Sequence, residues 1–298
     1  MPEQNISRKQ FIKKAAGLVT TGLLSPALAA ATPQYRVLGR TGIRVTQIGF
    51  GASRTMEPSL LKSALDTGIN FLDTGRGYSN GQNEVMVGNV IKDFRKDIVV
   101  QSKVRIRVRE KGDKLKTAAV SKKIRQMMET SLDESLRALQ TDYIDTLLFH
   151  GATSEEIINH EAVITFFDEA KKSGKIRGCG FSTHENQVNL LKANNKSKIY
   201  DVIMVSYNHK GSYLHSRSGR FNEWDQAALE EEMRVAEKNN IAIVAMKTCS
   251  GGTYSPSADI KPSYAEGLKW ILQHSFIRSA AVAMGNMNEI NENIQSMF

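Results

Sequence analysis

The sequence predicts an α/β fold, a closed (β/α)8 (TIM) barrel with an N-terminal β-hairpin. Apolar runs of strand length alternate with amphipathic helical stretches, which is typical of a parallel sheet covered by helices. Eight such runs follow one another, and no low-complexity linker interrupts residues 32–298. The first run ends in Gly49-Phe50-Gly51-Ala52-Ser53 and lacks the GxGxxG turn of a Rossmann fold. Eight units without a break favour a closed barrel over an open sheet.

The elements can be assigned in order along the chain. The β-prone stretches 35–38 and 43–45 flank a Gly-Arg-Thr-Gly turn and predict the hairpin. The predicted barrel strands are residues 47–51, 70–74, 98–103, 143–150, 176–182, 202–208, 241–246 and 280–284. Predicted helices between and after them include residues 121–139, 162–172, 226–238, 262–273 and 288–298. Apolar side chains recur in them at helical spacing.

The composition is that of a globular protein. The chain has 298 residues, of which 41% are hydrophobic and 24% are charged, which excludes collagen, low-complexity disorder and a polytopic membrane protein. Cys179 and Cys249 are the two cysteines and form no CxxC motif, so a disulfide scaffold, a zinc ribbon and an iron–sulfur cluster lack ligands. His160 and His209 show no metal-ligand spacing, and no metal site is predicted.

Residues 1–31 predict an export signal peptide, followed by one barrel domain over residues 32–298. Four basic residues and one acidic residue precede an apolar run over residues 15–28, and Ala27-Leu28-Ala29 is typical of a cleavage site. The run contains Gly17, Gly22 and Pro26, so we expect no stable membrane span after cleavage.

The basic part of this segment, Ser7-Arg8-Lys9-Gln10-Phe11, resembles the twin-arginine export motif, with Lys9 where the second arginine usually stands. The resemblance implies export of a folded protein by the twin-arginine machinery, to the periplasm or otherwise out of the cytoplasm. General secretory export and an uncleaved anchor are the alternatives.

Four polar residues stand at the carboxyl ends of predicted strands, where barrels of this kind carry their chemistry. These are Asp73, Tyr78, Lys103 and His150. A lysine favours the phenolate of a neighbouring tyrosine and lowers its pKa, so the phenol can exchange a proton near neutral pH. Aspartate would keep the lysine charged, and histidine would orient a carbonyl oxygen. Each residue alone is more often a helix cap or a surface charge, but the four together predict an active site.

Several stretches resemble the aldo/keto reductase superfamily. They are Arg36-Val37-Leu38-Gly39-Arg40-Thr41-Gly42, Gly68-Ile69-Asn70-Phe71-Leu72-Asp73-Thr74 with Tyr78, Gln101-Ser102-Lys103-Val104, Asp142-Tyr143-Ile144-Asp145 running to His150, and Gly180-Phe181-Ser182. The similarity extends in order over residues 35–293. It implies an oxidoreductase that transfers hydride between a nicotinamide cofactor, NAD(P)(H), and a carbonyl or alcohol substrate. Tyr78 would be the general acid/base, tuned by Asp73 and Lys103, with His150 orienting the substrate.

The resemblance also implies a cofactor pocket, in which this chain departs from the family pattern. Ser182 stands at the first nicotinamide contact, but Thr183 replaces asparagine and Met204 replaces glutamine. Met246 takes the place where many members have an aromatic residue, and Lys247 follows it. A thioether is at best a weak acceptor, although methionine offers a polarizable surface.

Phosphate contacts are expected after the last two strands, where barrels commonly bind phosphate through backbone N–H groups. The candidates are Ser250, Gly251, Gly285, Glu289 and Asn293. Relatives that prefer NADP(H) have a basic side chain after the last strand, whereas this chain has Glu289. An acid disfavours a 2′-phosphate and can accept from a ribose hydroxyl, so we expect a slight preference for NAD(H), with NADP(H) the alternative.

The chain carries a net charge of +9, which is concentrated after the third predicted barrel strand. Residues 103–125 hold ten basic and two acidic side chains. Arg105, Arg107 and Arg109 alternate and would project to one side of an extended segment. We expect Arg105 and Arg107 to attract an acidic carbonyl substrate, and a solvated loop without a specific role is the alternative. Nucleic acid is not expected, because aromatic residues are not interleaved with these charges.

The sequence therefore predicts a reductase acting on an aldehyde, ketone or sugar. Two alternative functions are also compatible with the sequence. One is a nicotinamide-binding redox sensor or non-catalytic subunit on the same barrel, which Met204 and Met246 favour. The other is aldehyde or sugar chemistry without nicotinamide. The fold alone does not decide between them.

Overall fold

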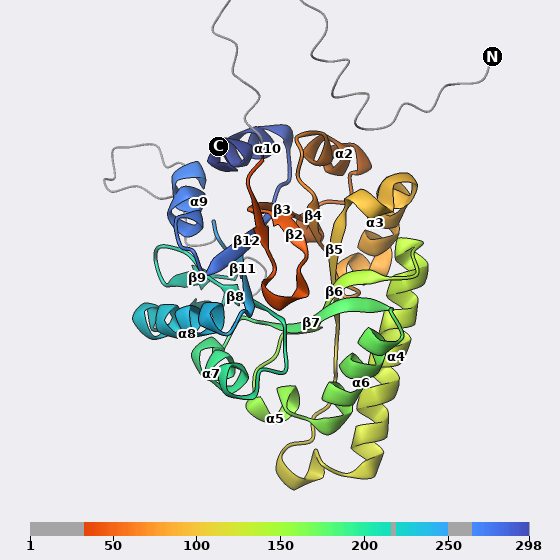
Figure 1. Ribbon diagram of the computed structural model, residues 1–298. Helices are drawn as coiled ribbons and strands as arrows, with labels where there is room; N and C mark the ends of the chain where they lie inside the picture. Colours follow the sequence, from red (N-terminus) through yellow and green to blue (C-terminus); the bar gives the residue numbers. More distant parts are fainter. Residues whose placement is uncertain (1–32, 216–218, 250–263, 298) are drawn as a thin grey trace, which may run out of the picture. The chain divides into compact units, whose positions relative to one another are not determined.

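A computed structural model describes residues 33–215, 219–249 and 264–297. Its centre is a closed barrel of eight parallel strands (Figure 1), which confirms the predicted fold class. Around the barrel these are β3 (Ile48–Gly51), β4 (Phe71–Asp73), β5 (Val99–Val104), β6 (Ile144–His150), β7 (Ile176–Thr183), β8 (Val202–Ser206), β11 (Ala242–Met246) and β12 (Ile277–Ala283). Strand β12 pairs with β3 in parallel register, and this pairing closes the barrel.

Helices surround the strands (Figure 1). They are α2 (Pro58–Asp66), α3 (Gln82–Ile91), α4 (Ala118–Leu139), α5 (Glu155–Ile158), α6 (Glu161–Lys172), α7 (Gln187–Ser197), α8 (Gln226–Lys238), α9 (Tyr264–Leu272) and α10 (Met287–Ile294). The longest, α4, buries Ile124, Met128 and Leu132 at helical spacing, and Thr117 caps its first turn. The main apolar core therefore lies between the strands and the helices.

The predicted N-terminal hairpin is present as β1 (Tyr35–Val37) and β2 (Arg44–Thr46). Leu38, Ile43 and Val45 belong to the same apolar cluster as residues of the barrel interior, so the hairpin closes one barrel end. Gly39 has φ +50°, and a Cβ there would lie 2.3 Å from the Asn240 carbonyl oxygen, so glycine permits this close approach. Because Asn240 precedes β11, the hairpin covers the amino ends of the strands.

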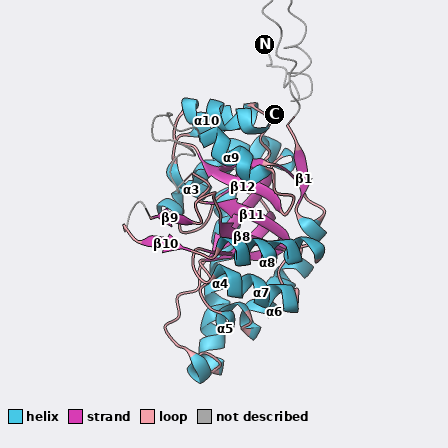
Figure 2. Ribbon diagram, turned by 90° about the vertical axis from the view of Figure 1, so that its left-hand side faces the viewer, coloured by secondary structure: helices cyan, strands magenta, loops and turns pink. Residues whose placement is uncertain are grey.

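The structure adds a second hairpin, β9 (Ser212–Leu214) and β10 (Phe221–Glu223), that the sequence pattern did not predict. Its three-residue strands are too short to show alternation. It follows β8, which ends at Ser206 rather than at the predicted residue 208. There the Asn208 side chain donates to the carbonyls of Ser212 (2.9 Å) and Lys247 (3.1 Å) and holds a turn. In Figure 2, β1 and the β9–β10 hairpin lie at opposite ends of the barrel.

Other sequence predictions can be compared with the described residues. Strand β12 starts at Ile277, three residues before the predicted residue 280, and the last predicted helix ends as an α-helix at Ile294. Cys179 and Cys249 are free. Within the described ranges, no group of three His, Cys, Asp or Glu side chains is placed to hold a metal ion. In the same part of the chain, no helix combines the length and apolar character of a membrane span.

Candidate active site

The structure brings together the four side chains predicted to form the site, at the carboxyl end of the barrel. Asp73 is the last residue of β4, Lys103 lies near the end of β5, and His150 ends β6. Tyr78 begins the short 3-10 turn that follows β4. Parallel strands in a closed barrel deliver their carboxyl ends to one face, and this geometry makes the four residues neighbours.

A buried ion pair forms the base of the site. The Lys103 ammonium lies 2.5 Å from Asp73 Oδ1 and donates to the Thr74 carbonyl at 2.7 Å. Only 1% of the Lys103 side chain and 4% of the Asp73 side chain are exposed. Gln101 Nε2 donates to the same carboxylate oxygen at 2.8 Å. Buried charges are tolerated when they are paired and hydrogen-bonded in this way, so the lysine is held charged and oriented.

Tyr78 lies over this ion pair. The Lys103 ammonium is 5.0 Å from the centre of the Tyr78 ring. Burial raises the pKa of the Tyr78 phenol above its usual range, and the positive charge of Lys103 lowers it only in part. The predicted net lowering of this pKa is therefore wrong, because the cost of burying a phenolate outweighs the attraction of Lys103. The phenol consequently holds its proton at neutral pH and is suited to act as an acid.

Burial also lowers the pKa of Lys103, but attraction to Asp73 and to Tyr78 outweighs it, so this pKa lies above its usual value. The ammonium therefore stays charged throughout the neutral range.

His150 packs edge-on against Tyr78, with the ring centres 5.6 Å apart and the planes at 88°. Burial, and then the positive charges of Lys103 and Arg105, lower the pKa of His150 to about 2. The imidazole is therefore neutral at neutral pH. Arg105 Nε donates to His150 Nδ1 at 3.3 Å, so Nδ1 acts as the acceptor. The remaining ring nitrogen, Nε2, must then carry the proton and can donate it to a carbonyl oxygen.

The predicted nicotinamide contacts differ in how well their side chains are placed for a ligand. Ser182 Oγ accepts the Gly151 N–H at 3.1 Å, and its hydroxyl can donate one further hydrogen bond. Thr183 Oγ1 donates to the Glu185 carbonyl at 2.5 Å, so its proton is already used. Met204 is nearly fully buried, as Ser182 is, and its sulfur accepts from Gln101 Nε2 at 3.6 Å. Ser182 is thus the polar contact that best fits a nicotinamide amide.

The cofactor contacts predicted near the ends of β11 and β12 differ in their surroundings. Met246 is buried in the apolar cluster of the barrel interior, and the Lys247 ammonium lies 5.3 Å from the centre of the Tyr213 ring. Glu289 accepts from the Gly285 N–H at 2.7 Å and from the Asn286 side chain at 3.0 Å. Asn286 caps α10 by accepting the Glu289 N–H at 3.0 Å, so the Glu289 carboxylate is held at the start of this helix. Asn293 is buried on α10, and Ser250 and Gly251 lie outside the described residues.

Two side chains outside the predicted site, His184 and Tyr213, lie beside it. His184 follows the contact residue Thr183, and its Nδ1 lies 3.3 Å from Ser206 Oγ. Burial, with Lys247 as the next contribution, lowers the pKa of His184 to about 4. Tyr213, on β9, is 3% exposed, and its ring centre is 6.0 Å from that of His184. A histidine directly after a predicted contact was a usable sequence signal, whereas the position of Tyr213 depends on the unpredicted hairpin.

The basic segment after β5 alternates as the sequence predicts. Arg105, Arg107 and Arg109 are exposed, while Ile106 and Val108 pack against the core. Arg105 differs from the other two because its guanidinium lies against Gly77 and its Nε contacts His150. One arginine of the row is therefore part of the site, and Arg107 is exposed beyond it.

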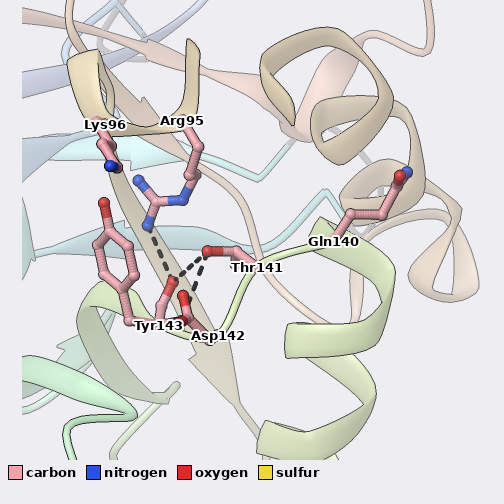
Figure 3. A pocket seen from close by; sticks show the side chains of 6 residues that line it. All are labelled: Arg95, Lys96, Gln140, Thr141, Asp142 and Tyr143. Carbon is pink, nitrogen blue, oxygen red and sulfur yellow. Dashed lines mark hydrogen bonds between the residues drawn. The ribbon is translucent and has the colours of Figure 1, made fainter. Parts of the chain in front are cut away.

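A surface hollow of about 510 Å³ lies at the opposite end of the barrel. It is lined by Arg95, Lys96, Gln140, Thr141, Asp142 and Tyr143 (Figure 3). These residues precede β5 and β6, so the hollow is at the amino ends of the strands. Arg95 packs over the Tyr143 ring at 4.2 Å and donates to the Tyr143 carbonyl at 3.0 Å. The side chains that line this hollow join neighbouring strands, and we assign the hollow no catalytic role.

Comparison with known proteins agrees with this geometry. The aldo/keto reductase family profile matches residues 51–267, so the chain belongs to this family of oxidoreductases. It is 29% identical to the uncharacterized oxidoreductase YqkF of Bacillus subtilis over 215 residues, which are 70% of this chain and 63% of that protein. It is 34% identical to a probable voltage-gated potassium channel subunit beta of Oryza sativa over 128 residues, 39% of this chain and 37% of that one. The matches thus span less than two thirds of either relative.

Among solved structures, an aldo-keto reductase from Klebsiella pneumoniae in complex with NADPH superimposes with a TM-score of 0.63 and 19% identity. The superposition covers 90% of each chain. At this identity the likeness supports the fold alone.

Proposed function

We propose that this protein transfers hydride between a nicotinamide cofactor and a carbonyl or alcohol substrate, with Tyr78 as the general acid/base. The observation that carries the proposal is the arrangement of the half-buried Tyr78 and His150 beside the buried Asp73–Lys103 ion pair at the carboxyl end of the barrel. A protonated phenol and a neutral imidazole, with ring centres 5.6 Å apart, suit a site that polarises one carbonyl oxygen. Family membership supports the same chemistry.

In the direction of reduction, a bound reduced nicotinamide would supply the hydride that the carbonyl carbon accepts. The chain's own residues act on the oxygen. His150 donates a hydrogen bond from Nε2 to the carbonyl oxygen and orients it. Tyr78 transfers its phenolic proton to the same oxygen as negative charge develops there, and Lys103 stabilises the phenolate that remains. In the reverse direction the phenolate takes the proton from the alcohol.

The residues proposed to hold the cofactor are Ser182, at the end of β7, and Met246 and Lys247, at the end of β11. Glu289 supports a slight preference for NAD(H), because its carboxylate occupies the start of α10. A negative charge there disfavours a 2′-phosphate. The Klebsiella relative in complex with NADPH represents the alternative. Fluorescence titration tests the preference: Glu289→Gln should tighten NADPH binding and leave NADH binding unchanged. Much tighter NADPH than NADH binding by the wild-type protein would overturn it.

We propose an anionic carbonyl compound as the substrate class. Arg105 lies against His150 and Arg107 is exposed beyond it, which supports recognition of a carboxylate or phosphate attached to the reacting carbonyl compound. The probes are 4-carboxybenzaldehyde and 4-methylbenzaldehyde, which differ in charge but are similar in size. Arg107→Gln should raise KM for the carboxylated aldehyde several-fold and leave KM for the neutral one unchanged. Equal changes for both aldehydes would refute recognition of charge.

The main experiment is the oxidation of NADH and NADPH over a panel of aldehydes, ketones and sugars. Tyr78→Phe should lower kcat/KM by about 10²–10⁴-fold, the usual contribution of a positioned proton donor, without weakening cofactor binding. Activity unchanged in this variant would remove Tyr78 from the mechanism.

A second candidate function is a nicotinamide-binding redox sensor or non-catalytic subunit. The similarity to a probable potassium channel subunit beta, together with the apolar Met204 at a cofactor position, favours it. Tight cofactor binding by the wild-type protein, with no turnover of any carbonyl in the panel, would support this function over the first.

We further propose that residues 1–31 direct export by the twin-arginine route. This segment lies outside the described residues, so the proposal depends on its sequence. Fusion of residues 1–31 to a fluorescent protein that matures only in the cytoplasm provides the test. Periplasmic fluorescence that disappears with Arg8→Gln supports folded export, and fluorescence confined to the cytoplasm contradicts it.

A further inference from the structure

A buried carboxylate that takes no part in proton transfer lies directly behind the site. Glu84, in the first turn of α3, is 0% exposed. Burial raises the pKa of its carboxyl above the usual range, with the Ser102 hydroxyl and Arg76 acting in the opposite direction. Keeping an acid in such a place is unfavourable unless its neighbours compensate, so its contacts indicate what it does.

Glu84 connects the two segments that carry Tyr78 and Lys103. Ser102, the residue before Lys103 on β5, donates from its hydroxyl to Glu84 Oε1 at 2.5 Å. Arg76, two residues before Tyr78, forms an ion pair with Glu84 Oε2, with its Nη1 at 2.9 Å. Oε2 has no hydrogen-bond partner among the described residues, and Arg76 Nη1 donates instead to the Glu134 carbonyl at 3.2 Å. Attraction between the charges therefore accounts for this contact.

The turn that carries Tyr78 is shaped around the Arg76 side chain. Gly81 has φ +87°, and a Cβ there would lie 1.2 Å from Arg76 Nη2. Glycine at this position thus leaves the space through which the guanidinium reaches Glu84. In the same turn, between Arg76 and Gly81, Ser79 and Asn80 adopt positive φ values of +47° and +51°, which are unfavourable for residues with side chains. This strained turn needs an external anchor to hold one conformation.

Backbone hydrogen bonds also attach the Tyr78 turn to β5. The Arg76 N–H donates to the Lys103 carbonyl at 3.2 Å, and the Tyr78 N–H donates to the Gly75 carbonyl at 2.9 Å. The turn is thus attached to β5 through the backbone at Lys103 and through Glu84 at Ser102. Loss of the ion pair would leave the backbone attachment and the hydrogen bond that Arg76 Nη1 donates to the Glu134 carbonyl on α4.

We propose that the Arg76–Glu84 ion pair is a positioning device that holds the Tyr78 turn in register with Lys103, so that the phenol stays beside the ammonium. The inference rests on the proposed function, in which Tyr78 transfers the proton. Neither Arg76 nor Glu84 touches the reacting atoms, and both act through Tyr78.

The test compares variants of this ion pair with a matched control at the other barrel end. Glu84→Gln keeps the size of the side chain and an acceptor for Ser102 but removes the charge that holds Arg76. We expect kcat for carbonyl reduction to fall about tenfold to a hundredfold, because small misplacements of a reacting group are costly, with KM within about twofold. Asp145→Asn removes an equally buried carboxylate far from Tyr78, and kcat should stay unchanged while the melting temperature falls.

Conservative rescue separates charge from packing. Arg76→Met should lower kcat as Glu84→Gln does, whereas Arg76→Lys should recover part of the loss because an ammonium can still pair with Glu84. Equal kcat in Arg76→Met and Arg76→Lys, or a wild-type kcat in Glu84→Gln, would overturn the proposal. A kcat loss in Asp145→Asn that matches the loss in Glu84→Gln would also overturn it, because general destabilisation would then explain both.

A spectroscopic readout keeps the test independent of turnover. With 13C-labelled tyrosine, the Tyr78 ring signal can be assigned by its absence in Tyr78→Phe and followed as pH rises. Glu84→Gln and Arg76→Met should raise the pKa at which this signal titrates, because the phenolate loses part of its contact with Lys103. If the wild-type protein reduces no carbonyl, the proposed function fails, and the titration still decides the positioning role. An unchanged Tyr78 titration in both variants would refute it.

Discussion

The two ends of the barrel each hold a buried carboxylate paired with a cation, yet they serve different purposes. At the amino end, Asp145 accepts from Arg95 at 2.8 Å, Arg177 at 2.7 Å and the Val100 N–H at 2.9 Å. At the carboxyl end, Asp73 holds Lys103, whose ammonium faces Tyr78. The groups around Asp145 join β5, β6 and β7, whereas the pair at Asp73 controls a phenol that can release a proton. A buried ion pair becomes a site only where a group that can react lies beside it.

The surface hollow does not mark the end of the barrel that carries the candidate active site. The 510 Å³ hollow at the amino end is lined by groups that hold strands together, and the hairpin closes the same barrel end. The side chains proposed for catalysis lie at the other end. The position of ionisable groups at the strand ends, rather than the size of a hollow, therefore identifies the site.

The largest expected effect comes from removing the cation of the site. Lys103→Met should lower kcat/KM by about 10²–10⁴-fold, because the phenolate of Tyr78 loses the charge that stabilises it. The same change leaves Asp73 buried without its counter-charge, which should cost about 3–5 kcal/mol of unfolding free energy. Steady-state kinetics and urea denaturation measure the two effects. A kcat/KM within threefold of the wild-type value would contradict the assigned role.

The matching change at the amino end should separate stability from activity. Asp145→Asn leaves Arg95 buried without its charged partner and should lower the unfolding free energy by about 3–5 kcal/mol. At a temperature where the variant is folded, kcat should equal that of the wild type, since no reacting group is touched. Urea denaturation and kinetics on the same preparation provide the measurement. A selective loss of kcat would show that the two ends are coupled.

A smaller effect is expected where the hairpin meets the amino end. Gly39→Ala places a methyl group against the Asn240 carbonyl oxygen, whereas Gly112→Ala, at the similar φ of +57°, meets nothing within 4 Å. Both variants carry the strain of a positive φ, about 1 kcal/mol. Gly39→Ala should cost about 1–3 kcal/mol more because of the overlap. Equal melting temperatures for the two variants would argue against close docking of the hairpin.

The smallest expected effect is that of pH on kcat/KM, which should not change across the neutral range. Reduction needs a protonated Tyr78, whose pKa is raised by burial above its usual value of about 10, so kcat/KM should fall only as pH rises through that higher value. The pKa of His150 is lowered to about 2, so this residue stays neutral and adds no limb near pH 6.5. The pH profile of kcat/KM between pH 5 and pH 9 should therefore be flat with respect to both groups. A limb near pH 6.5 that disappears in His150→Gln would show that the imidazole titrates.

The barrel, its N-terminal hairpin and the gathering of Asp73, Tyr78, Lys103 and His150 could all be predicted from the amino-acid sequence. These predictions succeed because they depend on local signals. Alternation of strand-like and helical runs fixes the architecture, and a closed parallel barrel sends every strand's carboxyl end to the same face. A residue placed at a strand end by the sequence is thereby placed in space.

How these groups interact depends on contacts that form only in the folded protein. Arg105 contacts His150 across 45 residues of sequence, and Glu84 meets Arg76 because Gly81 leaves room. The net pKa direction of Tyr78 depends on how deeply the phenol is buried, which no local pattern contains. These properties arise from distances between segments far apart in the chain and from the water excluded between them, because charge interactions and desolvation both vary steeply with position.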